Sequence, residues 1–160
     1  MSGASGSLAR ACRQARLAAF LLCGGTSILV AGLALSGLVP PGGHRPEGPF
    51  LQLGQAFTGL ILLSAAWVVW RRGRVMDGFA ALPEAQRPQV VVRETLRFAA
   101  LFALSGFCGL AYWGLVGQHA ARHALGFILL PPILCLAFLP RRDRWEKAAG
   151  PVPEGSRGVS

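Results

Sequence analysis

The chemistry that this sequence could support is centred on its three histidines, His44, His119 and His123. His119 and His123 are four residues apart, so a helix over this stretch would place both imidazoles on one face. Imidazole is a common metal ligand. A metal site needs three or four convergent ligands, and Glu47 is the available addition on the same side. We treat the histidines as candidate ligands for a metal or a heme, with solvated loop histidines as the alternative.

Two glutamines and the single tyrosine form a second polar set. Gln52 and Gln55 are three residues apart near the start of an apolar run, which would place them on one side of a helix. Tyr112 lies near the corresponding end of a later apolar run. Together with the histidines, these three side chains could line a polar pocket at the outer side of the protein.

A proline pair, Pro131-Pro132, lies in the middle of the last apolar run. Neither ring nitrogen can donate a hydrogen bond, so the carbonyls of Phe127 and Ile128 lose their helical partners. An unsatisfied carbonyl costs several kcal/mol in hydrocarbon, so we expect a kink that faces protein or water. The pair is either a hinge that moves or a static kink.

Several chemistries are missing from the sequence. Four apolar runs lack Asp, Glu, Lys, Arg and His, which argues against an ion-coupled carrier, an intramembrane aspartyl protease and a b-type cytochrome. No phosphate-binding glycine loop and no CxxC pair is present. We therefore expect no catalytic activity and no cofactor. The serines of the runs have no base nearby in their helices, and they are Ser27, Ser36, Ser64 and Ser105.

The elements that must position these residues are membrane helices. The chain is 52% hydrophobic and only 14% charged, with a mean hydropathy of +0.47. A helix needs about 20 apolar residues to cross a bilayer. The expected fold is an all-α membrane protein with four transmembrane helices, and their ranges are 17–39, 50–70, 98–117 and 120–139. The last range has an uncharged core of only 16 residues, so a re-entrant segment is the alternative there.

The distribution of basic residues predicts the orientation. Fourteen of the 16 lysines and arginines flank the runs on one side, and only Arg45 and Arg122 fall on the other. The side richer in basic residues is cytoplasmic. We expect an N-terminal tail (1–16) and a linker (71–97) inside the cell, a transmembrane domain over 17–147, and a disordered C-terminal tail (148–160). Both termini are then cytoplasmic, in a bacterial inner membrane.

Two alternatives concern the positive charge and the N-terminus. The arginines cluster at the ends of the apolar runs, which favours anionic lipid headgroups as their partners and argues against nucleic acid. A cleaved signal peptide over residues 1–36 is the alternative to the first span. Its apolar run exceeds the usual length of about 7 to 15 residues, and no small-x-small cleavage site follows it.

Small residues predict where helices approach one another. The first run carries Gly25 and Gly32 at a spacing of seven, followed by Ser36, and the third carries Ser105 and Gly109. Lipid gives no hydrophobic driving force between helices, so close packing at small residues must hold them together. We expect contacts inside the chain at these positions, with a dimer interface as the alternative.

The two halves of the chain resemble each other. Arg16 and Arg97 each precede a similar apolar pentapeptide stretch, and basic clusters close both halves. This pattern fits two duplicated helical hairpins, or simply two hairpins that obey the same charge rule. Between the halves, Pro88 is suited to the first turn of a helix that continues unbroken into the third run.

The leading functional hypothesis is a non-catalytic accessory, assembly or interaction subunit with a membrane-protein partner or a second copy. One alternative is a small oligomeric transporter or channel for an uncharged or apolar solute. The other is a metal or heme protein that uses the outer histidines. A continuous polar path past the glutamines and the proline pair would favour transport, and a dry bundle would favour the subunit.

Overall fold

A computed structural model describes residues 3–138 and 142–149 of the chain. These residues form four helices and their connections, without any β-strand in the described part. The helices are α1 (Gly3–Leu35), α2 (Pro49–Phe79), α3 (Arg87–Phe138) and α4 (Arg142–Ala149). Because α1, α2 and α3 are each long and apolar enough to cross a bilayer, the chain is a helical membrane protein.

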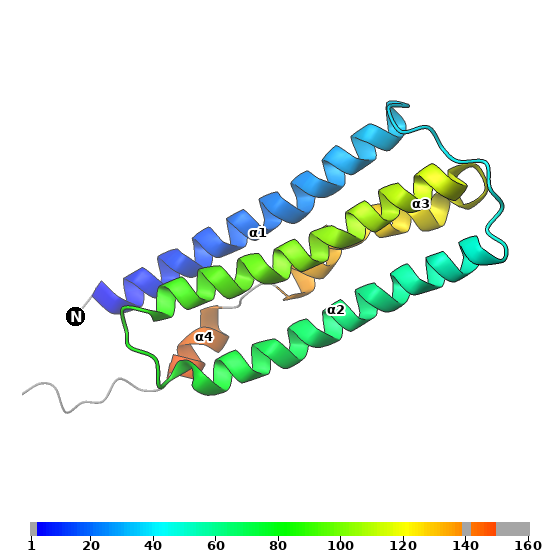
Figure 1. Cartoon of the computed structure of the whole chain (residues 1–160). Helices are drawn as coiled ribbons and strands as arrows, with labels where there is room; N and C mark the ends of the chain where they lie inside the picture. The colour runs from blue at the N-terminus through cyan, green and yellow to red at the C-terminus, as the bar shows by residue number, and fades with distance from the viewer. Residues whose placement is uncertain (1–2, 139–141, 150–160) are drawn as a thin grey trace, which may run out of the picture.

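The longest helix, α3, folds back on itself at Ala120. Ala120 has non-helical backbone angles (φ −134°, ψ 34°) and separates a first arm (87–119) from a second arm (121–138). The two arms run antiparallel (Figure 1). The rings of Phe102 and Phe138, one from each arm, have centroids 5.4 Å apart. The chain therefore has four long helical segments, and the reversal falls at the first residue of the expected fourth range.

The two arms approach most closely at Gly109. A Cβ atom added there would lie 2.8 Å from the amide nitrogen of Ile128 and 2.9 Å from the carbonyl oxygen of Ala124. Only glycine leaves room for such an approach. Ser105, one turn earlier, is also buried. The first arm thus uses the two small residues that the sequence analysis selected in this run.

The proline pair at 131–132 does not interrupt the second arm, whose backbone angles stay helical there. The two carbonyls that the prolines leave without helical donors have partners from neighbouring segments. Ser105 Oγ in the first arm donates to the carbonyl oxygen of Phe127 at 2.8 Å. Ser27 Oγ in α1 donates to that of Ile128 at 2.6 Å. Two hydroxyl groups therefore join α1 and both arms of α3.

The buried face of α1 differs from the face expected from its glycines. Gly25, Gly32 and Ser36 are exposed, and an added Cβ on either glycine would meet no atom within 4 Å. The hydrogen bond of Ser27 explains the difference. At about 100° per residue, a helix that points Ser27 inward points all three small residues to the opposite side. The face that packs on α3 carries other residues, namely Ala15, Ala19, Cys23, Ser27, Val30 and Ala34.

The helices continue beyond the apolar runs at one end of the bundle, which we call the basic end. Here α1 begins, α2 ends, α3 begins, and α4 packs between them (Figure 1). The rings of Phe79 and Trp145 are 4.7 Å apart at the centre of this end. The expected tail and linker thus contribute a second hydrophobic core, and its buried members are Leu8, Cys12, Ala15, Phe79, Val91 and Trp145.

The connection between α2 and α3 is short and well bonded. The guanidinium of Arg87 donates to the carbonyl oxygens of Ala80 at 3.0 Å and Leu82 at 3.2 Å, groups that follow the end of α2. Pro88 lies in the first turn of α3, and the helix continues from there into the apolar run. Both features of α3 were expected from the position of this proline.

α3 is the central element, because both α1 and α2 pack against it. In Figure 1, α1 and α2 lie on either side of the first arm, whereas the two arms of α3 touch directly. The two hairpins therefore differ in geometry, and their origin by duplication stays a prediction.

Ser27→Ala tests the bond between α1 and the second arm. The substitution leaves the carbonyl of Ile128 without this donor, and we expect a loss of about 0.6 to 1.7 kcal/mol in the free energy of unfolding, the mean and the maximum for interhelical hydrogen bonds in membranes. The loss is smaller than the cost of a bare carbonyl in hydrocarbon because the unfolded state in the membrane also finds partners for it. Ser36→Ala, one residue beyond the end of α1, is the matched control, because Ser36 is exposed and its hydroxyl bonds only to the preceding turn. Unfolding in mixed micelles followed by circular dichroism measures both. Equal effects of the two substitutions would contradict the assignment.

Candidate functional site

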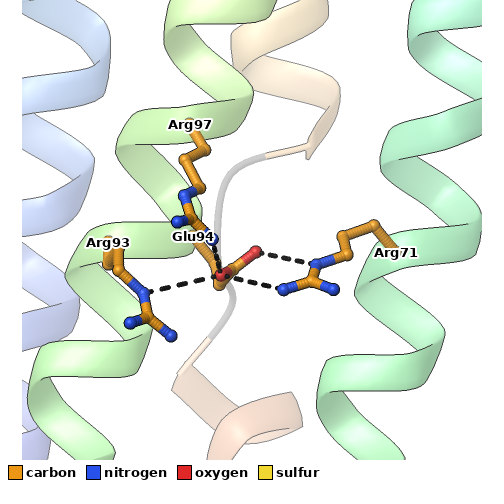
Figure 2. A network of polar contacts seen from close by, with 4 residues as sticks. All are labelled: Arg71, Arg93, Glu94 and Arg97. Carbon is orange, nitrogen blue, oxygen red and sulfur yellow. Dashed lines mark hydrogen bonds and ion pairs between the residues drawn. The ribbon is translucent and has the colours of Figure 1, made fainter.

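A buried carboxylate surrounded by arginines lies at the basic end, where α2 faces α3 (Figure 2). Glu94 is only 1% exposed. Its Oε1 atom is 2.8 Å from Nη1 of Arg97 and 3.7 Å from Nε of Arg93, both on α3. From α2, Arg71 contacts both carboxylate oxygens, with Nε 3.2 Å from Oε2 and Nη2 3.4 Å from Oε1. We call these four residues the Glu94 cluster.

The local sequence explains how the cluster forms. Arg97 follows Glu94 by three residues on α3, the spacing at which helical side chains meet. Arg71 is the first charged residue after the apolar run of α2. A buried carboxylate is destabilising unless it is paired and hydrogen-bonded, and the guanidinium of Arg71 supplies two donors in the plane that a carboxylate accepts. The pair therefore fixes the depth of α2 relative to α3.

This tie matters because α2 packs loosely. Only three of its 31 residues are buried, namely Ile61, Val68 and Phe79. Between α2 and α3, the rings of Trp67 and Phe98 meet edge-on at a centroid distance of 6.3 Å. In lipid such sparse contacts give little attraction, so the ion pair of Glu94 and Arg71 is the strongest specific contact that the structure describes between these helices.

The cluster has more positive than negative charge. One carboxylate faces three guanidinium groups, whose side chains are 36% (Arg71), 60% (Arg93) and 51% (Arg97) exposed. Each guanidinium has five N–H donors, and the contacts to Glu94 use only part of them. Arginine is well suited to carboxylate and phosphate. The arrangement can therefore bind an anion, whereas it offers no nucleophile.

The pattern of basic residues in the sequence predicts roles in orientation and in binding lipid headgroups for Arg71, Arg93 and Arg97, and it does not reveal this cluster. The available signal was an acidic residue within one turn of two arginines on the last turn before an apolar run. Its pairing with α2 depends on a contact between residues 23 positions apart, which helical periodicity does not reveal.

The three histidines lie in different surroundings. His44 is in the connection between α1 and α2, where its Nδ1 atom is 3.2 Å from the carbonyl oxygen of Leu115 and its ring stacks on Phe50. His119 and His123 are exposed on either side of the reversal. Throughout residues 3–138 and 142–149, no three His, Cys, Asp or Glu side chains converge as metal ligands. His44 thus joins the α1–α2 connection to the first arm of α3.

The residues of the expected polar pocket occupy different environments. Gln52 and Gln55 are exposed on α2, whereas Tyr112 is 4% exposed. The Tyr112 ring packs edge-on against Phe57 and Phe127, with centroids 6.4 and 6.0 Å away. Tyr112 therefore belongs to an aromatic cluster that closes this end of the bundle.

Two cysteines of the apolar runs, Cys23 and Cys135, share one buried hydrophobic cluster. The thiol of Cys23 donates to the carbonyl oxygen of Ala99 at 3.4 Å. The structure brings them to the same contact between α1 and the second arm. Buried cysteines of this kind pack as small hydrophobic residues.

Glu94→Gln tests the tie between α2 and α3. We expect it to lower the free energy of unfolding by about 2 kcal/mol, the value of a hydrogen bond to a charged group. In a double-mutant cycle, Arg71→Gln should then add little, because its partner is already gone. Glu84→Gln, at an exposed carboxylate in the α2–α3 connection, is the control and should change nothing. Additive effects at Glu94 and Arg71 would show that the contact contributes no stability.

Comparison with known proteins gives no further guide. No protein-family model, no curated protein and no solved structure matches this chain.

Proposed function

We propose that this chain is a non-catalytic interaction subunit that crosses a bacterial inner membrane four times, with both termini in the cytoplasm. The four segments are α1, α2 and the two arms of α3. The distribution of basic residues supports the orientation, because the basic end carries nearly all of the lysines and arginines within 3–138 and 142–149, and the charge rule assigns such an end to the cytoplasm.

The observation that carries the proposal is the tight packing around Phe102 together with the satisfied carbonyls of the proline pair. The two small cavities beside Phe102, in the middle of the bundle, have volumes of about 10 Å³ each, room for about one water molecule at most. The carbonyls freed by the proline pair accept hydrogen bonds from serine hydroxyls, and the ring of Tyr112 is buried against Phe57 and Phe127. Tight packing at mid-bundle with satisfied carbonyls supports a static structural role and favours an interaction subunit over a solute path within one copy.

The surface best suited to a partner is the exposed small-residue face of α1, formed by Gly25, Gly32 and Ser36. The hydrogen bond of Ser27 to the second arm directs this face away from the rest of the chain. Ile28 lies between the two glycines on the same face and is 76% exposed. Small residues let a second backbone approach closely in lipid, so we assign this face to a transmembrane helix of a partner protein.

Photo-crosslinking from Ile28 tests the proposal in native membranes. A photoreactive phenylalanine analogue at this position should give one adduct of defined mass, because it lies in the contact. The same analogue at Leu62 of α2, which is 65% exposed, is the control and should give no such adduct. Gly25→Leu with Gly32→Leu should abolish the Ile28 adduct.

Two outcomes would contradict this assignment. Recovery of only the 16.9 kDa chain, with no adduct from Ile28, would leave the face to lipid. An adduct of twice that mass would identify a second copy as the occupant in place of a partner protein.

Thiol labelling of intact cells tests the orientation. Gln118→Cys, near the reversal of α3, should react with a membrane-impermeant reagent. The natural Cys12 is buried at 3% exposure and is a poor inside control, so the matched variant is Glu84→Cys, at an exposed position. Glu84→Cys should react only after the membrane is permeabilised. The reverse pattern would invert the topology.

A further inference from the structure

A groove between α2 and α3 lies on the apolar side of the Glu94 cluster, with its lining residues Trp67 and Leu101 one helical turn from Arg71 and Arg97. Its volume is about 630 Å³. Five of its six lining residues are apolar, and the lining consists of Leu63, Ser64, Ala66, Trp67, Trp70 and Leu101. Because α2 packs loosely here, the groove opens sideways to the lipid.

Arginines stand at the end of this groove on the same helix faces that line it. Arg71 follows Trp67 by four residues, and Arg74 follows Trp70 by four, so each lies one turn beyond a lining tryptophan. On α3, Arg97 precedes the lining Leu101 by one turn. The apolar groove therefore ends at guanidinium groups contributed by both helices.

The contacts described at this end use only part of the donors on its guanidinium groups. Glu94 accepts one hydrogen bond from Arg97 and two from Arg71, which leaves several N–H donors on each guanidinium. The guanidinium carbon of Arg74 lies 4.7 Å from the centroid of the Trp70 ring, which holds a further positive charge at the mouth of the groove. Figure 2 shows Arg71 and Arg97 reaching toward the same carboxylate from opposite helices.

The length of the groove fits one lipid leaflet. From Leu63 to Trp70 the helix rises about 10 Å at 1.5 Å per residue. One leaflet contributes about 15 Å to a hydrocarbon core of about 30 Å. A lipid acyl chain that follows the groove would thus begin at the headgroup level, beside the arginines, and end inside the same leaflet.

We infer that this groove binds an anionic phospholipid, with one acyl chain along Trp67 and Trp70 and the phosphate at Arg74 and Arg97. The planar guanidinium group of arginine matches the oxygen atoms of a phosphate. The acyl chain of the lipid supplies the apolar contact that a soluble anion lacks. The site goes beyond the proposed function, since it requires no protein partner and lies on the opposite side of α3 from α1.

Quenching of tryptophan fluorescence by brominated lipids tests the site, because bromine quenches only on contact. The purified full chain is placed in phosphatidylcholine vesicles that contain a small fraction of brominated phosphatidylglycerol or, in parallel, brominated phosphatidylcholine. We expect several-fold stronger quenching by brominated phosphatidylglycerol than by brominated phosphatidylcholine at an equal fraction. The difference should vanish in Trp67→Phe with Trp70→Phe, which locates the signal in the groove.

Charge variants separate the site from general attraction to a basic protein. Arg74→Gln with Arg97→Gln should remove the preference for phosphatidylglycerol. Arg93→Gln is the matched control for Arg97→Gln alone, because each removes one charge from the Glu94 cluster and Arg93 lies on the side away from α2 (Figure 2). Arg93→Gln should keep the preference. Circular dichroism should show unchanged helix content in these variants.

Four results would overturn the inference. Equal quenching by both lipids would show no selection for the anionic headgroup. Failure of both lipids to quench would mean that the groove is closed or filled by a protein helix. A loss of preference in Arg93→Gln as large as in the double variant would reduce the effect to net charge. Reversal of quenching by inorganic phosphate would identify a simple anion site without a lipid chain.

Discussion

The two carbonyls freed by the proline pair are the constraint on which the bundle depends. Hydrocarbon offers no water to satisfy them, so hydroxyl groups must come from other helices. Ser105 meets one carbonyl from the first arm and Ser27 meets the other from α1. These two bonds fix the rotation of α1 and the register of the α3 reversal together. The exposed glycine face of α1 is a direct consequence, because it lies opposite Ser27 on the same helix.

α2 is held by a different kind of interaction. It lacks a polar bond to the bundle at mid-depth among the described contacts, and it is fixed near its two ends. At one end Glu94 binds Arg71, and at the other the hydroxyl of Tyr112 lies 3.0 Å from where a Cβ on Gly54 would stand. Between these points α2 can leave space beside α3, and the groove with its two tryptophans lies in that space. The loose packing of α2 and the lipid-accessible groove thus have one origin.

The sequence predicted what depends on local composition and missed what depends on contacts between distant residues. The helical membrane fold follows from apolar runs, and the start of α3 follows from Pro88. The prolines also predicted that two carbonyls need hydrogen-bond donors from elsewhere. The identity of those donors was not predicted, because Ser27 is 101 residues from Ile128 and periodicity does not rank one serine of α1 above another. The glycine spacing of α1 was misassigned to internal packing for the same reason. Among the candidate site residues, His44, Gln52 and Tyr112 have structural or exposed positions, whereas Glu94 emerged only with the fold.

The arginines of the basic end can serve orientation and structure without conflict. Orientation during insertion depends on lysines and arginines near the ends of spans, while acidic residues contribute little. Glu94 can therefore sit among three arginines without cancelling their effect on topology. After folding, the same carboxylate draws Arg71 and Arg97 together across the gap between α2 and α3. Orientation alone requires only that the arginines lie on one side of the membrane, and it does not require them to face a buried glutamate. The placement of Arg71 and Arg97 around Glu94 joins the helices and concentrates positive charge at the end of an apolar groove.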